Sequence, residues 1–220
     1  MTKLIFSIIP FGIGAAISPT LLIITVIALA SPSRRLLSGW AVVLGSGLAA
    51  LFYAVLGFLI GSTIHHKTHR NIDFVIDICV AVLLFILASR QWLRRNKASG
   101  KPTIADRLAK TSPRDFFVVG MIGMLCNATS IVLFIPAIHL ITKSNAGVTA
   151  RAAATLVMVL FLLLPVLIPV VIASLFGRHA DGVLSKLHTY VTDYTVQITA
   201  AVELLFGAYF LIKAIVEVSS

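Results

Sequence analysis

The chain has 220 residues, of which 59% are hydrophobic and only 12% are charged, and its mean hydropathy is +1.02. A soluble domain carries roughly 25% charged residues, so this composition excludes a soluble enzyme with an ordinary polar surface. The net charge of +10 lies mainly in short stretches between apolar runs. That placement favours membrane orientation and anionic headgroups over nucleic-acid binding.

Six apolar segments follow one another, and each is long enough to cross a hydrocarbon core of roughly 30 Å as a helix. They lie at about residues 4–30, 36–62, 72–93, 114–142, 151–176 and 194–216. The sequence therefore predicts an all-α integral membrane protein with six transmembrane helices. The fourth segment opens with Ser112, Pro113 and, two residues later, Asp115, which are the residues of a capped helix start.

The distribution of Lys and Arg predicts the orientation. With the N-terminus outside, the inner connections hold 12 of the 18 Lys and Arg residues and the outer side holds six, as the positive-inside rule requires. We expect a first three-helix repeat at 1–93, a basic cytoplasmic linker at 94–113 and a second three-helix repeat at 114–220. Both termini are then outside the bacterial inner membrane.

An internal repeat relates the first and fourth segments. Residues 14–20 (GAAISPT) and 123–129 (GMLCNAT) share the pattern Gly-x-x-x-[Ser/Asn]-[Pro/Ala]-Thr at an offset of 109 residues. Because each half has three segments, an odd number, the second half must enter the membrane inverted. Inverted repeats are typical of transporters that alternate access around a site at mid-membrane.

The repeated motif predicts two breaks lined by polar groups. Pro19 removes a backbone donor and frees carbonyl groups in the preceding turn, while Gly14 and Gly123 allow close approach. Polar side chains accompany both breaks: Ser18 and Thr20 in the first, and Asn127, Thr129 and Ser130 in the second. We expect the two clusters to meet and form the substrate pathway. Ordinary kinks with hydrogen bonds between packed helices are the alternative.

Two acids and two prolines lie within the apolar segments. Glu203 is near the middle of the last segment, where a carboxylate is costly, so it is a candidate for proton coupling or substrate contact, or forms a structural hydrogen bond. Asp77 is a second candidate that could line an outer vestibule, although acids also suit helix N-termini. Pro165 and Pro169 share one helical face and predict a bend or hinge.

Other motifs give no support to catalysis. The sequence contains no Walker A, HExxH or nucleophile-elbow pattern, so we expect neither enzymatic activity nor a cofactor. The histidines at 65, 66 and 69 are close to Lys and Arg and favour a solvated loop over a metal site. Cys79 and Cys126 are far apart in apolar segments, and we expect buried thiols without a disulfide.

The size, the six segments, the 3+3 repeat and the early Gly-x-x-x-Ser-Pro motif resemble the LysE superfamily of small exporters. Within it, residues 12–22 (GIGAAISPTLL), followed by Arg34 and Arg35, resemble the GAP or Sap family, the peptidoglycolipid- and sulfolipid-addressing proteins. This resemblance implies outward movement of an envelope lipid or similar amphiphile. The chain has Thr20-Leu21 where amino-acid exporters of the superfamily typically have Gly-Pro. Its neutral Ser18 and Asn127 disfavour metal export.

Three functions stay open from the sequence. The first is a secondary exporter of a (glyco)lipid, the second is an exporter of an amino acid or small metabolite, and the third is a non-transporting assembly factor for a lipid-export complex. Membrane lipids are the expected partners, and nucleic acid is not. A homodimer and a larger lipid-export complex are both compatible with the sequence.

Overall fold

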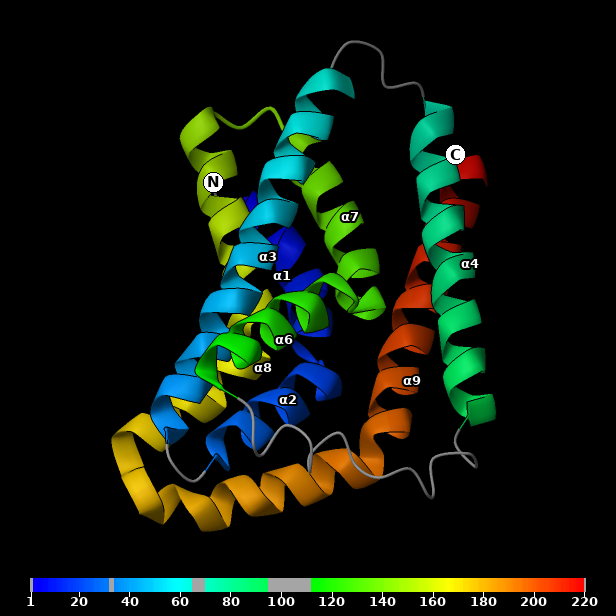
Figure 1. Cartoon of the computed structure of the whole chain (residues 1–220). Helices are drawn as coiled ribbons and strands as arrows, with labels where there is room; N and C mark the ends of the chain where they lie inside the picture. Colours follow the sequence, from blue (N-terminus) through cyan, green and yellow to red (C-terminus); the bar gives the residue numbers. More distant parts are fainter. Residues whose placement is uncertain (1, 32–33, 65–69, 95–111, 220) are drawn as a thin grey trace.

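The computed structural model describes residues 2–31, 34–64, 70–94 and 112–219, and these form helices joined by short connections (Figure 1). In chain order the helices are α1 (Thr2–Ala16), α2 (Pro19–Leu29), α3 (Arg35–Ile64), α4 (Arg70–Arg94), α6 (Pro113–Leu125), α7 (Ala128–Lys143), α8 (Val148–Phe176) and α9 (Asp181–Ser219). Most of the predicted 94–113 linker, and the histidines at 65, 66 and 69, fall outside the described residues.

Three helical stretches in the described residues are long and apolar enough to cross a bilayer: Arg35–Phe58, Val148–Phe176 and Asp193–Val216. The first and fourth apolar segments are not single helices. Each is a pair of helices, Leu4–Ala16 with Pro19–Leu29 bent by 57°, and Pro113–Leu125 with Ala128–Lys143 bent by 59°. If each bent pair counts as one span, the number of candidate spans rises to five. The structure thus supports a multi-pass membrane protein with two broken helices.

The helix starts follow the local sequence. The Ser112 hydroxyl accepts a hydrogen bond from the Asp115 backbone N–H, and the Asp115 carboxylate accepts one from the Ser112 backbone N–H. This reciprocal capping box confirms the start that the sequence predicted for the fourth segment. The prolines Pro165 and Pro169 are both buried within α8, which continues through them as one helix to Phe176.

Helices α3 and α6 cross at very short range because both carry glycine at the crossing. A Cβ atom added to Gly45 would overlap the backbone carbonyl of Phe117, and one added to Gly120 would come within 2.6 Å of the Val42 carbonyl oxygen. The close approach lets the Ser46 hydroxyl donate to the Gly120 carbonyl oxygen at 3.1 Å. Small residues at such crossings are typical of membrane helices.

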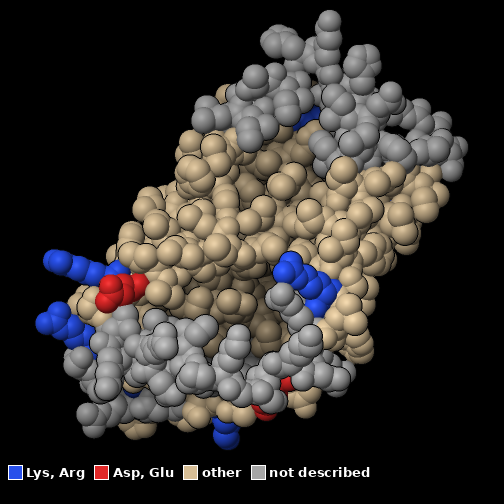
Figure 2. All heavy atoms as spheres, turned by 45° about the vertical axis from the view of Figure 1, so that its right-hand side comes forward, with Lys and Arg blue, Asp and Glu red and all other residues tan. Residues whose placement is uncertain are grey.

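Large apolar side chains cover much of the outer surface. On α3 alone, Leu44, Leu48 and Leu51 are 63%, 53% and 53% exposed, which water would penalise and lipid would not. Figure 2 shows a broad band of uncharged surface, with the visible charged side chains gathered towards the ends of the molecule. The outer surface therefore suits a bilayer.

The two termini lie towards the same end of the molecule, as Figure 1 shows. The first part of α9, drawn in orange, runs across the opposite end before the helix turns along the other spans (Figure 1). An arrangement of this kind brings the middle of α9 beside the broken helices, and α9 packs against both α2 and α4.

Candidate functional site

The first break is produced by the Ser18-Pro19 pair. Helix α1 ends at Ala16, and α2 starts with Pro19 as its first helical residue after Ser18 in an extended conformation (φ −121°). Proline suits this position because its missing N–H is one that a helix start leaves unpaired. The Ser18 side chain makes no capping hydrogen bond to α2, so its hydroxyl is available to another helix.

The second break is produced by Asn127. Helix α6 ends at Leu125, and Asn127 caps α7 with its side-chain oxygen, which accepts a hydrogen bond from the Ser130 N–H at 3.5 Å. Asn is among the best helix-capping residues, and this cap leaves the side-chain amide nitrogen free to donate elsewhere. The interruption predicted from the repeat therefore occurs in both segments.

The two breaks meet inside the protein. The Asn127 Nδ2 donates a hydrogen bond to the Ser18 Oγ at 2.7 Å, joining residues that are 109 positions apart. The Ser130 hydroxyl donates to the Ala15 carbonyl oxygen at 3.2 Å, one of the carbonyls that Pro19 was expected to free. Ser18 and Ser130 are 6% and 1% exposed, so these contacts lie in the interior.

The two motif glycines pack in reciprocal positions. A Cβ atom on Gly14 of α1 would overlap side chains of Leu133 on α7 and Phe206 on α9. A Cβ atom on Gly123 of α6 would lie 3.0 Å from the Ile24 side chain on α2. Each glycine thus belongs to the first helix of one broken pair and faces the second helix of the other pair.

A polar cavity of about 290 Å³ lies where the breaks meet α9. Glu203, which is 0% exposed, is on its wall. Its Oε1 accepts a hydrogen bond from the Thr129 hydroxyl at 2.9 Å. The lining residues are Ile17, Ser18, Pro19, Thr20, Leu87, Gly123, Cys126, Asn127, Ala128, Thr129, Thr195, Thr199 and Glu203.

The sequence reasoning missed two members of this wall, Thr195 and Thr199. They precede Glu203 at intervals of four residues and so share one face of α9. The Thr199 hydroxyl donates to the Thr195 carbonyl oxygen at 2.7 Å. The four-residue spacing of polar groups in an apolar segment was the signal that could have found them.

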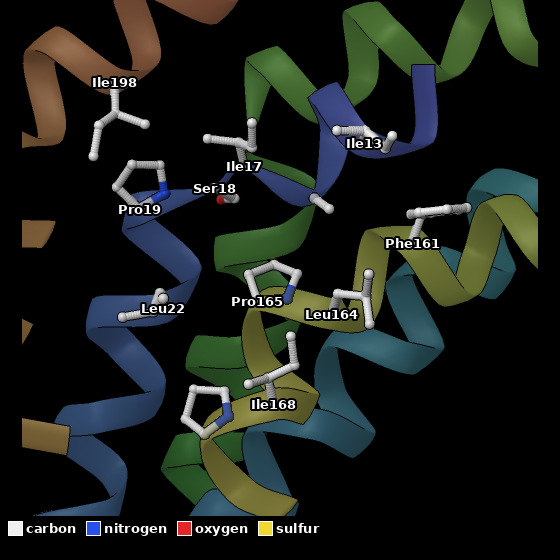
Figure 3. Close-up of a pocket in the computed structure, with 12 residues that line it drawn as sticks. Ile13, Ile17, Ser18, Pro19, Leu22, Phe161, Leu164, Pro165, Ile168 and Ile198 are labelled. Carbon is white, nitrogen blue, oxygen red and sulfur yellow. The ribbon is translucent and has the colours of Figure 1, made fainter. Parts of the chain in front are cut away.

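An apolar cavity of about 430 Å³ adjoins the polar one. The two cavities share Ile17, Ser18 and Pro19. Figure 3 shows Leu164 and Pro165 of α8 facing the first break across this cavity. The remaining lining residues are Ile13, Ala16, Leu22, Phe161, Ile168, Pro169 and Ile198.

Some predicted residues lie elsewhere. Asp77 is not on the cavity wall; its Oδ2 accepts an ion-paired hydrogen bond at 2.6 Å from Lys213 across the α4–α9 contact. The two prolines of α8, Pro165 and Pro169, line the apolar cavity. The prediction of buried cysteines is wrong, because Cys79 and Cys126 are exposed free thiols. No group of three or more metal-ligating side chains occurs within the described stretches.

Together the bent helices and the apolar surface define a multi-pass membrane protein, and the polar cavity at its two helix breaks is the candidate site. A family profile described as Sap, sulfolipid-1-addressing protein, matches residues 8–216. The chain therefore belongs to this family, which confirms the predicted resemblance to the GAP or Sap family. Neither a curated protein nor a solved structure gives a significant match.

Proposed function

We propose that the chain is a secondary-type transporter that assists the outward movement of an envelope glycolipid or a similar amphiphile. The observation that carries this proposal is the junction of the two cavities at Ser18 and Pro19. An amphiphile needs a polar wall for its headgroup and an apolar wall for its hydrocarbon, and the two walls meet at this break. The family description, which names a sulfolipid, supports the same substrate class.

The proposed architecture has six crossings in two inverted three-helix halves. Five of them are the candidate spans, with each bent pair counted as one, and α4 is the sixth. The order bent pair, long helix, helix occurs twice, and the bends of 57° and 59° are nearly equal. The packing is reciprocal as well, since α1 contacts α7 while α6 contacts α2. An even number of crossings agrees with termini at one end of the molecule (Figure 1).

In the proposed mechanism, the polar cavity is opened alternately to each side of the inner membrane. The Asn127–Ser18 hydrogen bond joins the two halves, so rocking of one half against the other must break it or carry both groups together. Pro165 and Pro169 give α8 a stretch with fewer backbone hydrogen bonds beside the cavity. These two prolines are therefore the proposed hinge.

The polar cavity alone would also suit an amino acid or another small polar metabolite. The adjoining apolar cavity favours the amphiphile, because a small polar solute gains nothing from an apolar wall. A non-transporting assembly role would need a partner surface, and the candidate for it, the 94–113 linker, lies mostly outside the described residues. The transport proposal therefore has the more direct structural support.

The test replaces the paired polar groups with apolar ones. Ser18→Leu and Asn127→Leu each remove the interhelical hydrogen bond and one polar wall of the cavity, and we expect at least a tenfold loss of surface glycolipid at normal protein abundance. Surface lipids and secreted metabolites are compared by mass spectrometry in strains that carry each variant. Ser174→Leu is the matched control, because the Ser174 hydroxyl bonds only its own helix at the Val170 carbonyl oxygen. Wild-type lipid and metabolite export in both variants would refute the site.

A further inference from the structure

The apolar cavity beside the first break is a groove between α8 and α9. The α1–α2 break forms its floor, and α2 packs against both α8 and α9. Figure 3 shows Ile198 of α9 on one side of the break and Pro165 of α8 on the other. Because the groove and the polar cavity share Ser18 and Pro19, a molecule lying across the break would contact both.

One end of the groove is closed by packing just before the break. A Cβ atom on Gly12 of α1 would come within 2.6 Å of the Phe161 ring on α8. The ring of the next residue back, Phe11, lies 5.7 Å from the Phe210 ring on α9, centroid to centroid. Helix α1 is thus in contact with both walls at this level. At the opposite end of the molecule, the first part of α9 runs across the ends of the other helices (Figure 1).

The side of the groove is open. Ile13 and Ile168 line it and are 52% and 48% exposed. Ile13 belongs to the first bent pair and Ile168 to the candidate span Val148–Phe176, so the surface that exposes them is the one that suits hydrocarbon. The groove therefore opens sideways, towards the interior of a bilayer.

The two cavities are small for a whole lipid. Their volumes are about 430 and 290 Å³, and pockets that enclose a drug-sized ligand measure about 300–1,000 Å³. A glycolipid with two long acyl chains is larger than such a ligand. The polar cavity has room for a headgroup, but the groove has room for only part of the hydrocarbon.

We propose that the groove between α8 and α9 is a lateral portal, through which the acyl chains of the cargo extend into the bilayer while its polar part occupies the polar cavity. This inference rests on the proposed transport function and specifies how the site takes its substrate. The chains then keep hydrocarbon surroundings throughout. Only the polar part, which is costly to move through hydrocarbon, needs a path inside the protein.

Photo-cross-linking tests where the acyl chain lies. The full-length chain is placed in phosphatidylglycerol nanodiscs that contain sulfoquinovosyl diacylglycerol with a diazirine in one acyl chain, and the labelled residues are identified by mass spectrometry. We expect labelling of Leu164, Ile168 and Ile198. A roughly tenfold excess of the unlabelled glycolipid should lower it about fivefold or more, because the two lipids compete for one site.

Leu160 is the matched control for this labelling. It is on the same helix and is 49% exposed, close to the 48% of Ile168, but it does not line the groove. Its labelling by bulk lipid should not respond to the competitor. Absence of labelling in the groove overturns the inference. Labelling there that the competitor does not lower also overturns it, since bulk lipid would then fill the groove.

A bulky side chain at the rim tests whether transport uses the portal. Ile168→Trp and, on the opposite wall, Ile198→Trp should each lower surface glycolipid at least about fivefold at normal protein abundance, because the new ring occupies the space of the acyl chain. Leu160→Trp should export normally. An equal loss in Leu160→Trp would show that the groove has no special role and overturns the inference.

The variants at the polar cavity separate this inference from the transport proposal. Ser18→Leu and Asn127→Leu remove polar groups and leave the α8 and α9 walls unchanged. Loss of export in these two, with normal export in Ile168→Trp and Ile198→Trp, overturns the lateral portal and leaves the transport proposal standing. Normal export in all four variants refutes both proposals.

Discussion

The hydroxyl of Thr129 donates a 2.9 Å hydrogen bond to the Oε1 of Glu203, and this contact joins the first turn of α7 to the middle of α9. Thr129 and Glu203 are 7% and 0% exposed. A hydrogen bond between membrane helices contributes about 0.6 kcal/mol on average and up to about 1.7 kcal/mol. A carboxyl partner in a closed interior should bring this one towards the upper end.

Thr129→Val should therefore lower the free energy of unfolding by about 1–2 kcal/mol while it preserves side-chain shape. Thermal unfolding in nanodiscs checks the change. Thr142→Val is the control on the same helix, because the buried Thr142 hydroxyl bonds the Ile138 carbonyl oxygen one turn back and not another helix. Equal losses of unfolding free energy in the two variants would mean that the contact to Glu203 stabilises the protein no more than a hydrogen bond within one helix.

The position of Glu203 also makes it the candidate for proton coupling. If Glu203 takes up and releases a proton during each cycle, the rate of export must depend on pH, and Glu203→Gln should remove that dependence because an amide does not titrate. The measurement is glycolipid export against external pH. Asp77→Asn should keep the wild-type profile, since Asp77 pairs with Lys213 away from the cavity. An unchanged profile in Glu203→Gln leaves Glu203 a structural role.

The Asp77–Lys213 ion pair gives a separate stability prediction. The Lys213 side chain is 41% exposed and that of Asp77 is 4% exposed, so solvent or headgroups screen the pair in part. A double-mutant cycle with Asp77→Asn and Lys213→Met should give a coupling energy of about 1 kcal/mol. The midpoints of unfolding of the four proteins supply the value. Strictly additive effects would show that the pair contributes nothing.

The sequence predicted the broken helices because proline and asparagine act on the backbone locally. Pro19 cannot continue a helix that precedes it. Asn127 favours the start of a helix, because its side-chain oxygen can accept a hydrogen bond from a free backbone N–H of the first turn. The repeat of 109 residues then related the two breaks without any knowledge of packing. These features were predictable because their cause lies within a few residues of the break.

The partners of Glu203 and Asp77 were not predictable in the same way. Glu203 meets Thr129 only because α9 turns after its first part and passes beside α7, and no local pattern in residues 181–192 specifies that path. Asp77 likewise finds Lys213 through the packing of α4 on α9. The spacing of Thr195 and Thr199 before Glu203 was readable, but a polar face on an apolar helix does not reveal which helix it meets.

The glycine contact between α3 and α6 predicts unequal effects of one methyl group. Gly45→Ala would place the new carbon against the carbonyl of Phe117, and overpacking against backbone should cost about 1–3 kcal/mol or more. Gly47→Ala has open space around its Cβ, and the helix propensity of alanine should stabilise it by up to about 1 kcal/mol. Thermal unfolding and membrane abundance compare the two variants. Equal behaviour would contradict the close crossing.

The orientation can be checked at residue 100, in the stretch that the charge distribution assigns to the cytoplasm. The native thiols are first removed as Cys79→Ser and Cys126→Ser, because both are exposed. A single cysteine is then introduced as Gly100→Cys. The positive-inside rule predicts that a membrane-impermeant maleimide labels it in inside-out vesicles and not in intact cells. A cysteine introduced as Lys3→Cys is the reciprocal control and should react in intact cells. Labelling of position 100 from outside would show that the topology is the inverse of the predicted one.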